Sequence, residues 1–475
     1  MSLNVANMLN SFSILKEFIV PLSIKNLSLI SILALVFFLL GVLGLQLQSN
    51  QTGVSPIWPA SGWTLACLLL YGFRLWPGVL LGMIFLGIYV GLPLWVALVT
   101  GVGTIMESVI PLIVARRYGF TGRLDTLYEA LVFSAIVAFG PVISAGIGAV
   151  ALYISTANEN MPSQALVMLW WLGNSVGMLF FGGVIIALNE GIEKGVFFRF
   201  FWEKTGIVLG ALMICVLAIS RSKGIESALF INLIIPLTLY GAIRFGAFGA
   251  LAPGLLIMMT FLMSAGNLPQ SFFEHAPFGY LYLILVEVWF VGISGVLIAG
   301  AFRDRVSQVR MKWLAHHDTL TKLANRNVLE LETAHALEGM RRMDHSVCLL
   351  FIDLDQLKPV NDQFGHMIGD KLLVSAGKLL TKHVRRSDIV ARWGGDEFII
   401  LLRNCSLNEA RVIADKIHRD SHGLSSALRG QVNISFSIGV VQASINDSQE
   451  SLIDRADRAC YQAKTEGRDR VVVVG

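Results

Sequence analysis

Long apolar stretches fill the first 301 residues of the chain, and shorter amphipathic stretches replace them afterwards. A helix that crosses about 30 Å of hydrocarbon needs roughly 20 consecutive apolar residues. About ten stretches approach or reach this length, so we predict a multi-pass α-helical membrane domain with about ten membrane-spanning helices. The predicted spans are residues 27–47, 57–72, 75–91, 94–115, 130–153, 165–188, 205–219, 227–243, 248–264 and 279–301.

From His316 onward the apolar positions recur with the periods of helices and strands. In residues 369–385 they repeat every three to four positions and share one helix face. Gly394 and Gly395 separate two apolar strands and indicate a hairpin. A soluble α+β domain is therefore predicted. Its helices are 325–342, 369–385, 407–421 and 451–466, and its strands are 346–353, 388–393, 397–403, 432–441 and 470–474.

The distribution of charge supports this division. The first 301 residues carry 12 Lys and Arg and 11 Asp and Glu, whereas the remaining 174 carry 25 and 22. The net charge is +4 and neither half is strongly basic, which argues against a nucleic-acid partner. We predict a cytoplasmic segment 1–26, a membrane domain 27–301, a helical linker 302–315 and a soluble domain 316–475.

Lys and Arg gather in alternate predicted loops, as expected when cationic loops stay on the cytoplasmic side. Four loops on the opposite side carry neither residue: 48–56, 92–93, 154–164 and 265–278. Only loop 220–226 breaks the alternation. Both ends of the membrane domain are therefore predicted in the cytoplasm. The first apolar run is too long and starts too late for a cleavable signal peptide.

Two carboxylates, Glu107 and Glu287, fall within predicted spans, where an unpaired charge costs about 2–3 kcal/mol or more. One interpretation is an acid hydrogen-bonded inside the bundle or near its boundary, and the other is a sensing or ion-linked role. The sequence leaves both open. The five cysteines lie far apart without a CxxC pair, so we expect free thiols rather than a zinc site or disulfides.

The junction between the domains has a short amphipathic pattern. Phe302, Val306, Val309 and Trp313 follow a 4-3-4 spacing that places them on one helix face. Such a face can pair two helices in a dimer. The alternative is the frayed end of the last membrane helix.

Polar residues form three clusters in the soluble domain. Asp353 ends an apolar strand, and Asp396 and Glu397 lie on the predicted hairpin. Asn361 and Asp370 lie at a loop and a helix start. Two carboxylates from different strands beside a glycine turn can hold Mg²⁺ against a triphosphate. Each cluster alone is also compatible with an ordinary turn or helix cap.

Taken together, these clusters resemble the GGDEF family, whose name residues 394–398 spell. The resemblance covers about residues 314–475. Further matching motifs are residues 317–321, 325–326, 353–355, 361–362, 365–366, 369–370, 437–439, 461–464 and 467–468. It implies a nucleotidyl-cyclase-like fold with a central, mostly antiparallel sheet flanked by helices. It also implies a diguanylate cyclase that makes cyclic di-GMP and pyrophosphate from two GTP through an antiparallel homodimer.

The resemblance also implies the roles of individual residues. Two Mg²⁺ ions, for which Mn²⁺ could substitute, would be held by Asp353, the backbone carbonyl of Leu354 and Asp396. Asp396 or Glu397 would help to deprotonate the attacking hydroxyl. The implied substrate contacts are Asn361 and Asp370 at the guanine edge, Lys358, Lys464 and Arg468 at the phosphates, and His366, Gly394 and Gly395 in nucleotide-contacting segments.

A further match is Arg385 and Asp388, which precede the hairpin. In the family this RxxD spacing marks an inhibitory product site that binds cyclic di-GMP, so product inhibition is expected. A local ion pair is the alternative.

The membrane half has its own motifs. Residues 57–63 and 70–78 place two Trp-Pro pairs around an apolar helix, and residues 170–177 begin with Trp-Trp. Such residues can simply anchor helix ends. The arrangement nevertheless resembles the MASE1 family of bacterial integral-membrane sensor domains over roughly residues 27–301. That resemblance implies a multi-pass protein of the inner membrane, in contact with the lipid bilayer, whose sensory ligand or partner protein is unknown.

The sequence departs from the GGDEF pattern at several loop positions and at none of the implied metal or base contacts. Gln356 and Leu357 stand where His-Phe is usual, and Asp469 stands where Asn is usual. Two other classes of function remain: a non-catalytic GTP or cyclic di-GMP receptor that signals to a protein partner, and a transporter regulated by its soluble domain.

Overall fold

The computed structural model describes residues 18, 23–46, 55–155, 164–193, 201–220, 234–264, 278–343, 345–424 and 434–475. The chain forms two compact units, Met1–Val306 and Ser307–Gly475. Most of the predicted N-terminal segment, most of four predicted loops and the start of predicted strand 432–441 lie outside the described residues.

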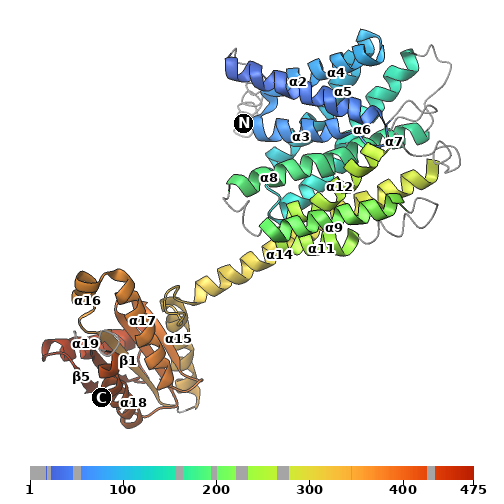
Figure 1. The fold of residues 1–475 in the computed structure, drawn as a ribbon. Coiled ribbons are helices and arrows are strands. Elements are labelled where there is room, and N and C mark those ends of the chain that lie inside the picture. The colour runs from blue at the N-terminus through green and yellow to red at the C-terminus, as the bar shows by residue number, and fades with distance from the viewer. Residues whose placement is uncertain are drawn as a thin grey trace, which may run out of the picture. The chain divides into compact units, whose positions relative to one another are not determined.

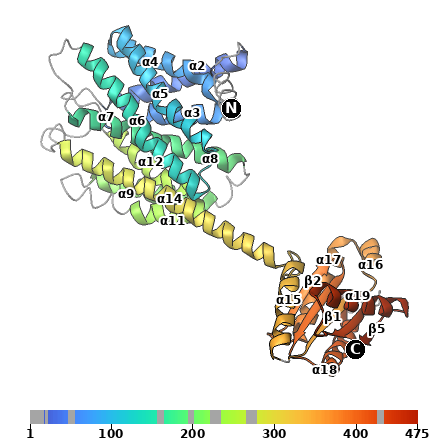
Figure 2. The same ribbon diagram turned by 180° about the vertical axis from the view of Figure 1, so that it is seen from behind.

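The first unit is built from helices, and each predicted span contains one (Figures 1 and 2). They are α2 (Ile24–Leu45), α3 (Pro59–Tyr71), α4 (Trp76–Val90), α5 (Leu94–Arg117), α6 (Leu127–Ser155), α7 (Gln164–Gly177), α8 (Gly183–Glu193), α9 (Phe201–Ser220), α11 (Ile234–Phe245), α12 (Ala247–Ser264) and α14 (Phe278–His316). Within the described residues, six helical stretches are long and apolar enough to cross a membrane. Three further apolar helices are shorter, so ten crossings stays a prediction.

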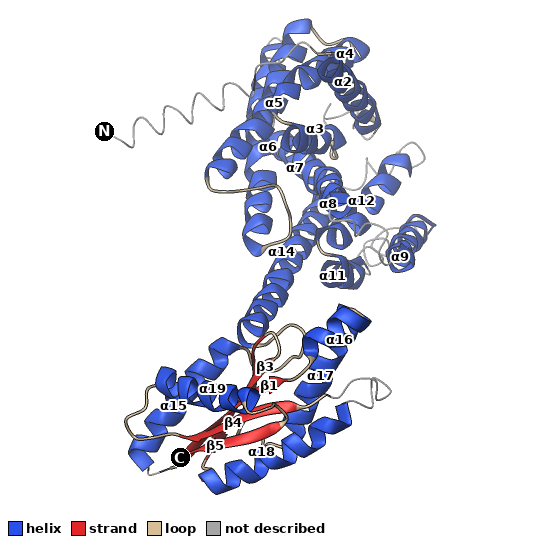
Figure 3. Cartoon of the chain, turned by 90° about the vertical axis from the view of Figure 1, so that its left-hand side faces the viewer, coloured by secondary structure: helices blue, strands red, loops and turns tan. Residues whose placement is uncertain are grey.

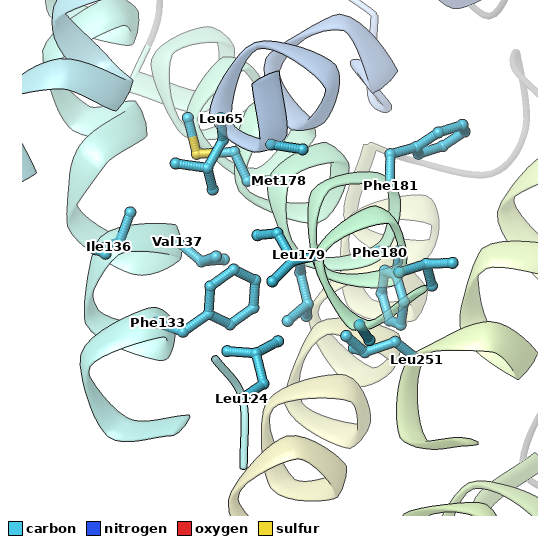
Figure 4. Close-up of a cluster of buried hydrophobic side chains, with 14 of the residues drawn as sticks. Leu65, Leu124, Phe133, Ile136, Val137, Met178, Leu179, Phe180, Phe181 and Leu251 are labelled. Carbon is cyan, nitrogen blue, oxygen red and sulfur yellow. The ribbon is translucent and has the colours of Figure 1, made fainter. Parts of the chain in front are cut away.

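A short π-helical segment, Met178–Gly182, joins α7 to α8 at the centre of this unit. Its Leu179 and Phe180 pack among Phe133 of α6 and Leu251 of α12 (Figure 4). Helix α3 approaches the same region so closely that a Cβ at Gly62 would lie 2.1 Å from the Gly177 carbonyl oxygen. Small residues permit such close contact between backbones. Membrane helices rely on close packing of this kind, because an apolar side chain is as favourable in lipid as it is against another helix.

Glu107 of α5 lies fully buried inside the bundle. The Ser61 hydroxyl donates to its Oε1 at 2.5 Å, and the Asn174 amide donates to its Oε2 at 3.0 Å. The Ser144 hydroxyl donates to Oε2 as well. The interpretation as a hydrogen-bonded acid within the bundle therefore describes Glu107. Glu287 is half-buried beside a small cavity that Thr238 also lines.

Helix α14 is continuous from Phe278 to His316 and includes the predicted linker 302–315. Phe302, Val306 and Val309 are exposed along it. Trp313 stacks on His317, with ring centroids 5.0 Å apart. The four residues of the predicted apolar face therefore lie on one continuous helix.

The second unit has a five-stranded sheet in the order β2-β3-β1-β4-β5. The strands are β1 (Val347–Leu354), β2 (Ile389–Gly394), β3 (Glu397–Arg403), β4 (Phe436–Gln442) and β5 (Arg470–Val474). The helices are α15 (Arg326–Met343), α16 (Leu357–Phe364), α17 (His366–Lys382), α18 (Leu407–Ser421) and α19 (Gln449–Thr465). All strand pairs are antiparallel except β4 with β5, which confirms the mostly antiparallel sheet.

Helices cover both faces of this sheet, α17 and α18 on one and α15 and α19 on the other (Figure 3). Alternate residues of β1 enter the two cores, as the two-residue period of a strand requires. Leu350 and Ile352 face α17 and α18, whereas Leu349 and Phe351 face α15 and α19. By the same alternation, Asp353 belongs to the α19 face.

Helix α16 was not predicted. Its residues carry Pro359, which usually interrupts a helix, but here the proline lies in the first turn, where its missing N–H is not needed. The chain enters α16 through Gln356, which has a positive φ of 68°. Asn361 therefore lies on a helix rather than in a loop.

Candidate active site

Three charged side chains meet at the end of β1. Asp353 is the last residue of β1 paired with β3, and its partner across the ladder is Glu397. Directly opposed residues of an antiparallel pair point to the same face. Lys464 of α19 lies over that face, and its Nζ is 2.6 Å from the Asp353 Oδ2. Sheet register and helix position therefore bring together two predicted acids and a predicted phosphate-binding lysine.

Asp396 occupies the turn of the β2–β3 hairpin, as predicted. Its backbone carbonyl accepts a hydrogen bond from the Leu354 N–H at 3.0 Å, which ties the turn to the end of β1. Gly395 has a positive φ of 47°, a conformation that glycine adopts without steric cost. Both Gly394 and Gly395 are exposed. The hairpin tip is thus open to a ligand beside the carboxylates.

Arg392 also stabilises the hairpin, although the sequence did not indicate a role for it at the site. Its guanidinium donates to the Gly395 carbonyl at 2.7 Å and forms an ion pair with Asp318 at 3.2 Å. Asp318 in turn accepts hydrogen bonds from Thr321. Burial works to raise the pKa of Asp318, but the bonds from Thr321 and Arg392 outweigh it and hold that pKa below its usual value. Asp318 belongs to a motif noted above, yet only the fold shows that it supports the hairpin.

Asp355 lies two residues beyond Asp353 but has a different environment. Its carboxylate accepts hydrogen bonds from the hydroxyls of Ser435 and Ser437 at 2.8 and 2.9 Å. The backbone N–H of Asp469 also donates to it, at 3.3 Å. Because these donors already occupy its oxygens, Asp355 connects the ends of β1, β4 and β5 rather than facing a ligand.

Burial and crowding shift the acid–base properties of the site. Burial is the main cause that raises the pKa of Asp353, and the neighbouring Asp396 adds to it, although Lys464 opposes both. Burial likewise raises the pKa of Glu397, with Lys464 opposing and Asp353 and Asp396 contributing. Burial tends to lower the pKa of Lys464, but its bond to Asp353 prevails and raises it. The site therefore holds more negative charge than its own lysine neutralises.

The resemblance implies Mg²⁺ at this site, and the carboxylates present are suitable ligands for it. Asp353, Asp396 and Glu397 offer hard carboxylate oxygens, which are the ligands that Mg²⁺ prefers. They come from the end of β1, the hairpin turn and the start of β3, and the exposed glycines of that turn leave one side of the site open for phosphate and water. The residues present fit Mg²⁺ bound together with a nucleotide.

The predicted guanine contacts lie on the other side of the sheet, on α16 and α17. The Oδ1 of Asn361 is buried and has no hydrogen-bond partner among the described residues. It lies against Gly369, where a Cβ would approach it to 1.9 Å. Asp370 follows at the exposed surface of α17. Lys358 and His366 are also exposed, on α16 and at the start of α17.

A cleft of about 340 Å³ reaches Glu397 from the face covered by α15 and α19. Four other acids line it: Glu330, Glu450, Asp454 and Asp457. Neither Asn361 nor Asp370 takes part in its lining. Like charges repel a polyphosphate, so this cleft is a poor place for a nucleotide without cations.

The remaining predicted site residues are Arg468 and the pair of the predicted inhibitory site, Arg385 and Asp388. Arg468, with a φ of 63°, lies in the turn before β5, and its Nε is 3.8 Å from the Asp355 Oδ1. Asp388 accepts hydrogen bonds from the backbone N–H groups of Arg385 and Arg403 at 2.9 and 3.3 Å. Because Asp388 is engaged by backbone rather than by the Arg385 side chain, the local ion pair is not formed here.

Comparison with known proteins identifies both halves of the chain. A family model described as "Diguanylate cyclase, GGDEF domain" matches residues 315–470, and the MASE1 family model matches residues 29–303. A probable diguanylate cyclase of Escherichia coli K12, DgcE, is 38% identical over 182 residues, which cover 38% of this chain and 16% of that protein. The diguanylate cyclase DgcP of Pseudomonas aeruginosa is 34% identical over 176 residues, 37% of this chain and 26% of that protein.

Solved structures of similar domains are also found. The coiled coil and GGDEF domain of DgcB from Caulobacter crescentus, in complex with c-di-GMP, is 26% identical and covers 36% of this chain and 91% of that chain, with a TM-score of 0.33. The active GGEEF domain of a diguanylate cyclase from Vibrio cholerae is 30% identical and covers 32% and 97%, with a TM-score of 0.31. These two curated relatives are thus matched over only 16% and 26% of their own lengths.

Proposed function

The chain belongs to the MASE1 family and carries a GGDEF domain at residues 315–470, and from this premise we propose that it is a membrane-bound diguanylate cyclase. It condenses two GTP into cyclic di-GMP and releases pyrophosphate. The observation that carries this proposal is the convergence of Asp353, Asp396 and Glu397 beside Lys464 at the open end of β1. We place this enzyme in a bacterial inner membrane with the catalytic domain in the cytoplasm.

The reaction is an in-line displacement at the α-phosphorus. The 3′-oxygen of one GTP forms the new P–O bond as the bond to pyrophosphate breaks, and the same step from the second GTP closes the ring. Asp353, Asp396 and the Leu354 carbonyl would hold two Mg²⁺ ions, or Mn²⁺, whose charge offsets the charge that develops on the phosphates. Two nucleotides must face each other, so the proposal includes an antiparallel homodimer in which each subunit presents one GTP.

The chain's own residues bind and orient the substrate. Asn361 and Asp370 hydrogen-bond the guanine edge, which discriminates strongly against bases that lack the complementary groups. Lys358 and Arg468 meet the phosphates with Lys464, which moves from Asp353 to the nucleotide when the latter binds. Gly394 and Gly395 let the nucleotide approach the backbone closely, and His366 lies beside the guanine-binding segment.

Proton removal from the 3′-hydroxyl is assigned to Glu397 together with Asp396. A carboxylate with a raised pKa is a stronger base while still ionised near neutral pH. The raised pKa of Glu397 therefore suits it to this role.

Two regulatory features complete the proposal. Arg385, which is exposed, and Asp388, which is half-buried, form an inhibitory site for the product just before β2. The membrane domain binds a sensory ligand or partner and sets how often the two half-sites meet. A domain that binds GTP or cyclic di-GMP without turnover is the competing function.

The test uses the full chain, purified in detergent and incubated with GTP and Mg²⁺. We expect cyclic di-GMP from the wild type and a loss of at least a hundredfold in Asp396→Ala, measured by chromatography of the products. Asp415→Ala, an exposed carboxylate on α18, is the matched control and keeps its rate. Nucleotide binding without any product from the wild type would instead identify a receptor.

A further inference from the structure

Three side chains far from the hairpin tip gather at the end of α18. His418 lies in the last turn of α18, and His422 caps that helix. Asp469 lies in the turn between α19 and β5, 47 positions beyond His422. The Asp469 Oδ1 is 2.8 Å from the His418 Nε2 and 3.3 Å from the His422 Nε2. One ligand atom from each residue lies within 4.8 Å of the others.

The backbone holds the three residues in this arrangement. His418 and His422 are four positions apart, so both imidazoles project from one side of the helix. Asp469 has a φ of 50°, and its N–H donates to Asp355, which fixes the turn against the end of β1. The cluster is therefore held by a helix on one side and by a hydrogen-bonded turn on the other.

The chemistry of the cluster differs from that of the proposed Mg²⁺ site. Two imidazole nitrogens and one carboxylate oxygen suit Zn²⁺ and related transition metals, whereas Mg²⁺ prefers oxygen alone. Zinc–ligand bonds of about 2.0–2.2 Å put tetrahedral ligand atoms about 3.3–3.5 Å apart. The two distances from Asp469 to the histidines, 2.8 and 3.3 Å, are close to this range, and the ligand atoms of the two histidines lie within 4.8 Å of each other.

The surroundings also favour a cation. The carbonyl end of α18 carries partial negative charge toward the last turn. The side chain of His422 is 50% exposed and that of Asp469 is 46% exposed, so an ion from solution can reach the cluster. Three protein ligands leave a fourth position for water.

We propose that His418, His422 and Asp469 form a binding site for a transition-metal ion of the zinc class, separate from the catalytic centre. Bound there, the ion clamps the end of α18 to the turn that precedes β5. That turn contains Arg468, so the clamp restricts a residue of the proposed phosphate site. Asparagine at position 469, which the GGDEF pattern favours, would lack the anionic oxygen.

The alternative is a cluster that needs no ion. Asp469 can accept hydrogen bonds from both imidazoles, and exposed His–Asp pairs of this kind are common. The chain contains such a pair for comparison, since the His383 Nε2 lies 2.9 Å from the Asp420 Oδ2. That pair offers only two ligands and is not expected to bind zinc tightly.

The experiment measures metal binding by the full chain, purified without a polyhistidine tag and stripped with a chelator. Calorimetry with Zn²⁺ should show one saturable site per chain when excess Mg²⁺ occupies the carboxylates of the proposed catalytic centre. The affinity should fall at least tenfold in His418→Ala, His422→Ala and Asp469→Asn. His383→Ala should bind like the wild type.

A second measurement guards against variants that fail to fold. Co²⁺ bound by these three residues should give visible absorption bands typical of low coordination number, and each of the three variants should lose them. A circular dichroism melt of each variant verifies that it is folded. The proposal is overturned if the wild type shows no saturable Zn²⁺ binding, or if a folded His418→Ala variant binds as tightly as His383→Ala. Neither result depends on cyclase activity.

Discussion

At the scale of single residues, the proposed active site concentrates negative charge at a cost in stability. The carboxylates of Asp353, Asp396 and Glu397 repel one another. The one lysine among them, Lys464, forms an ion pair with Asp353. Active sites commonly sacrifice stability for function in this way. The consequence can be measured at Glu397, whose raised pKa has burial as its main cause.

We predict that Glu397→Gln is more thermally stable than the wild type at neutral pH without divalent ions. When the pKa of a carboxyl group is higher in the folded protein than in the unfolded chain, the folded protein binds more protons at pH values between these two pKa values. Stability therefore falls as pH rises from the unfolded pKa through the folded one. Removing the charge removes this loss, and we expect a Tm increase of about 1–4 °C at pH 7.5.

The measurement is a pair of thermal melts at pH 4.5 and 7.5, each with and without Mg²⁺. The difference between variant and wild type should shrink at the lower pH, where Glu397 is more protonated. It should also shrink with Mg²⁺, which binds the wild type more tightly. A lower Tm for the variant at pH 7.5 would show that Glu397 contributes a net favourable interaction to the fold.

At the scale of elements, the contact between α16 and α17 positions the proposed guanine-binding amide. Gly369 lacks a side chain where a Cβ would come within 1.9 Å of the Asn361 Oδ1. We predict that Gly369→Ala displaces Asn361 and raises the KM for GTP about tenfold or more, because one hydrogen bond to the base is lost. The rate at saturating GTP should change much less.

The control for this substitution is Gly339→Ala on α15, where a Cβ would meet nothing within 4 Å. Alanine in a helix is favoured over glycine by about 1 kcal/mol, so Gly339→Ala should be at least as stable as the wild type. Unchanged GTP affinity in Gly369→Ala would contradict the assignment of Asn361 to the nucleotide.

The elements also show what could be predicted from the sequence. Apolar periodicity is a local property, so the strands and most helices of the second unit lie within a few residues of the predicted ranges. Helix α16 was not predicted because Pro359 and the polar residues around it suggest a loop. The helix is stabilised by the packing of Leu357 and Val360 against α17. Its length and position depend on tertiary contacts.

Sequence motifs predicted which acidic residues belong to the candidate site, but not the contacts between them. Asp353 and Asp396 were identified from their positions at strand and hairpin ends. The ion pair between Lys464 and Asp353, the support of the hairpin by Arg392 and Asp318, and the engagement of Asp355 by serines all join segments distant in the chain. Spacing alone carries no information about such contacts.

At the scale of the whole molecule, the proposed function includes communication from the membrane domain to the GGDEF domain, and α14 contributes residues to both units. It runs without interruption through residues 302–313, whose apolar side chains Phe302, Val306 and Val309 are exposed. Exposed apolar residues along one helix face favour pairing with a second copy of that helix. A small change in how such helices pair could alter how often two half-sites meet.

We predict that single cysteines introduced at Val306 or Val309 form disulfide-linked dimers in membranes more readily than cysteines at Ser307 or Gln308. All four positions are exposed, but the first two share the apolar face and the last two lie away from it. Four of the five native cysteines, Cys67, Cys348, Cys405 and Cys460, are buried and contribute little background. Crosslinked fractions on non-reducing gels provide the measurement.

The same variants test whether α14 transmits a signal. A disulfide at 306 and one at 309 fix the paired helices at points almost one turn apart, so the two cyclase domains are held in different relative orientations. We expect the two crosslinked dimers to differ in cyclic di-GMP production by several-fold, and reduction of the disulfide should abolish the difference. Equal rates in the two locked dimers would mean that helix pairing does not control the enzyme. Regulation would then have to act by another route, such as the proposed product site at Arg385 and Asp388.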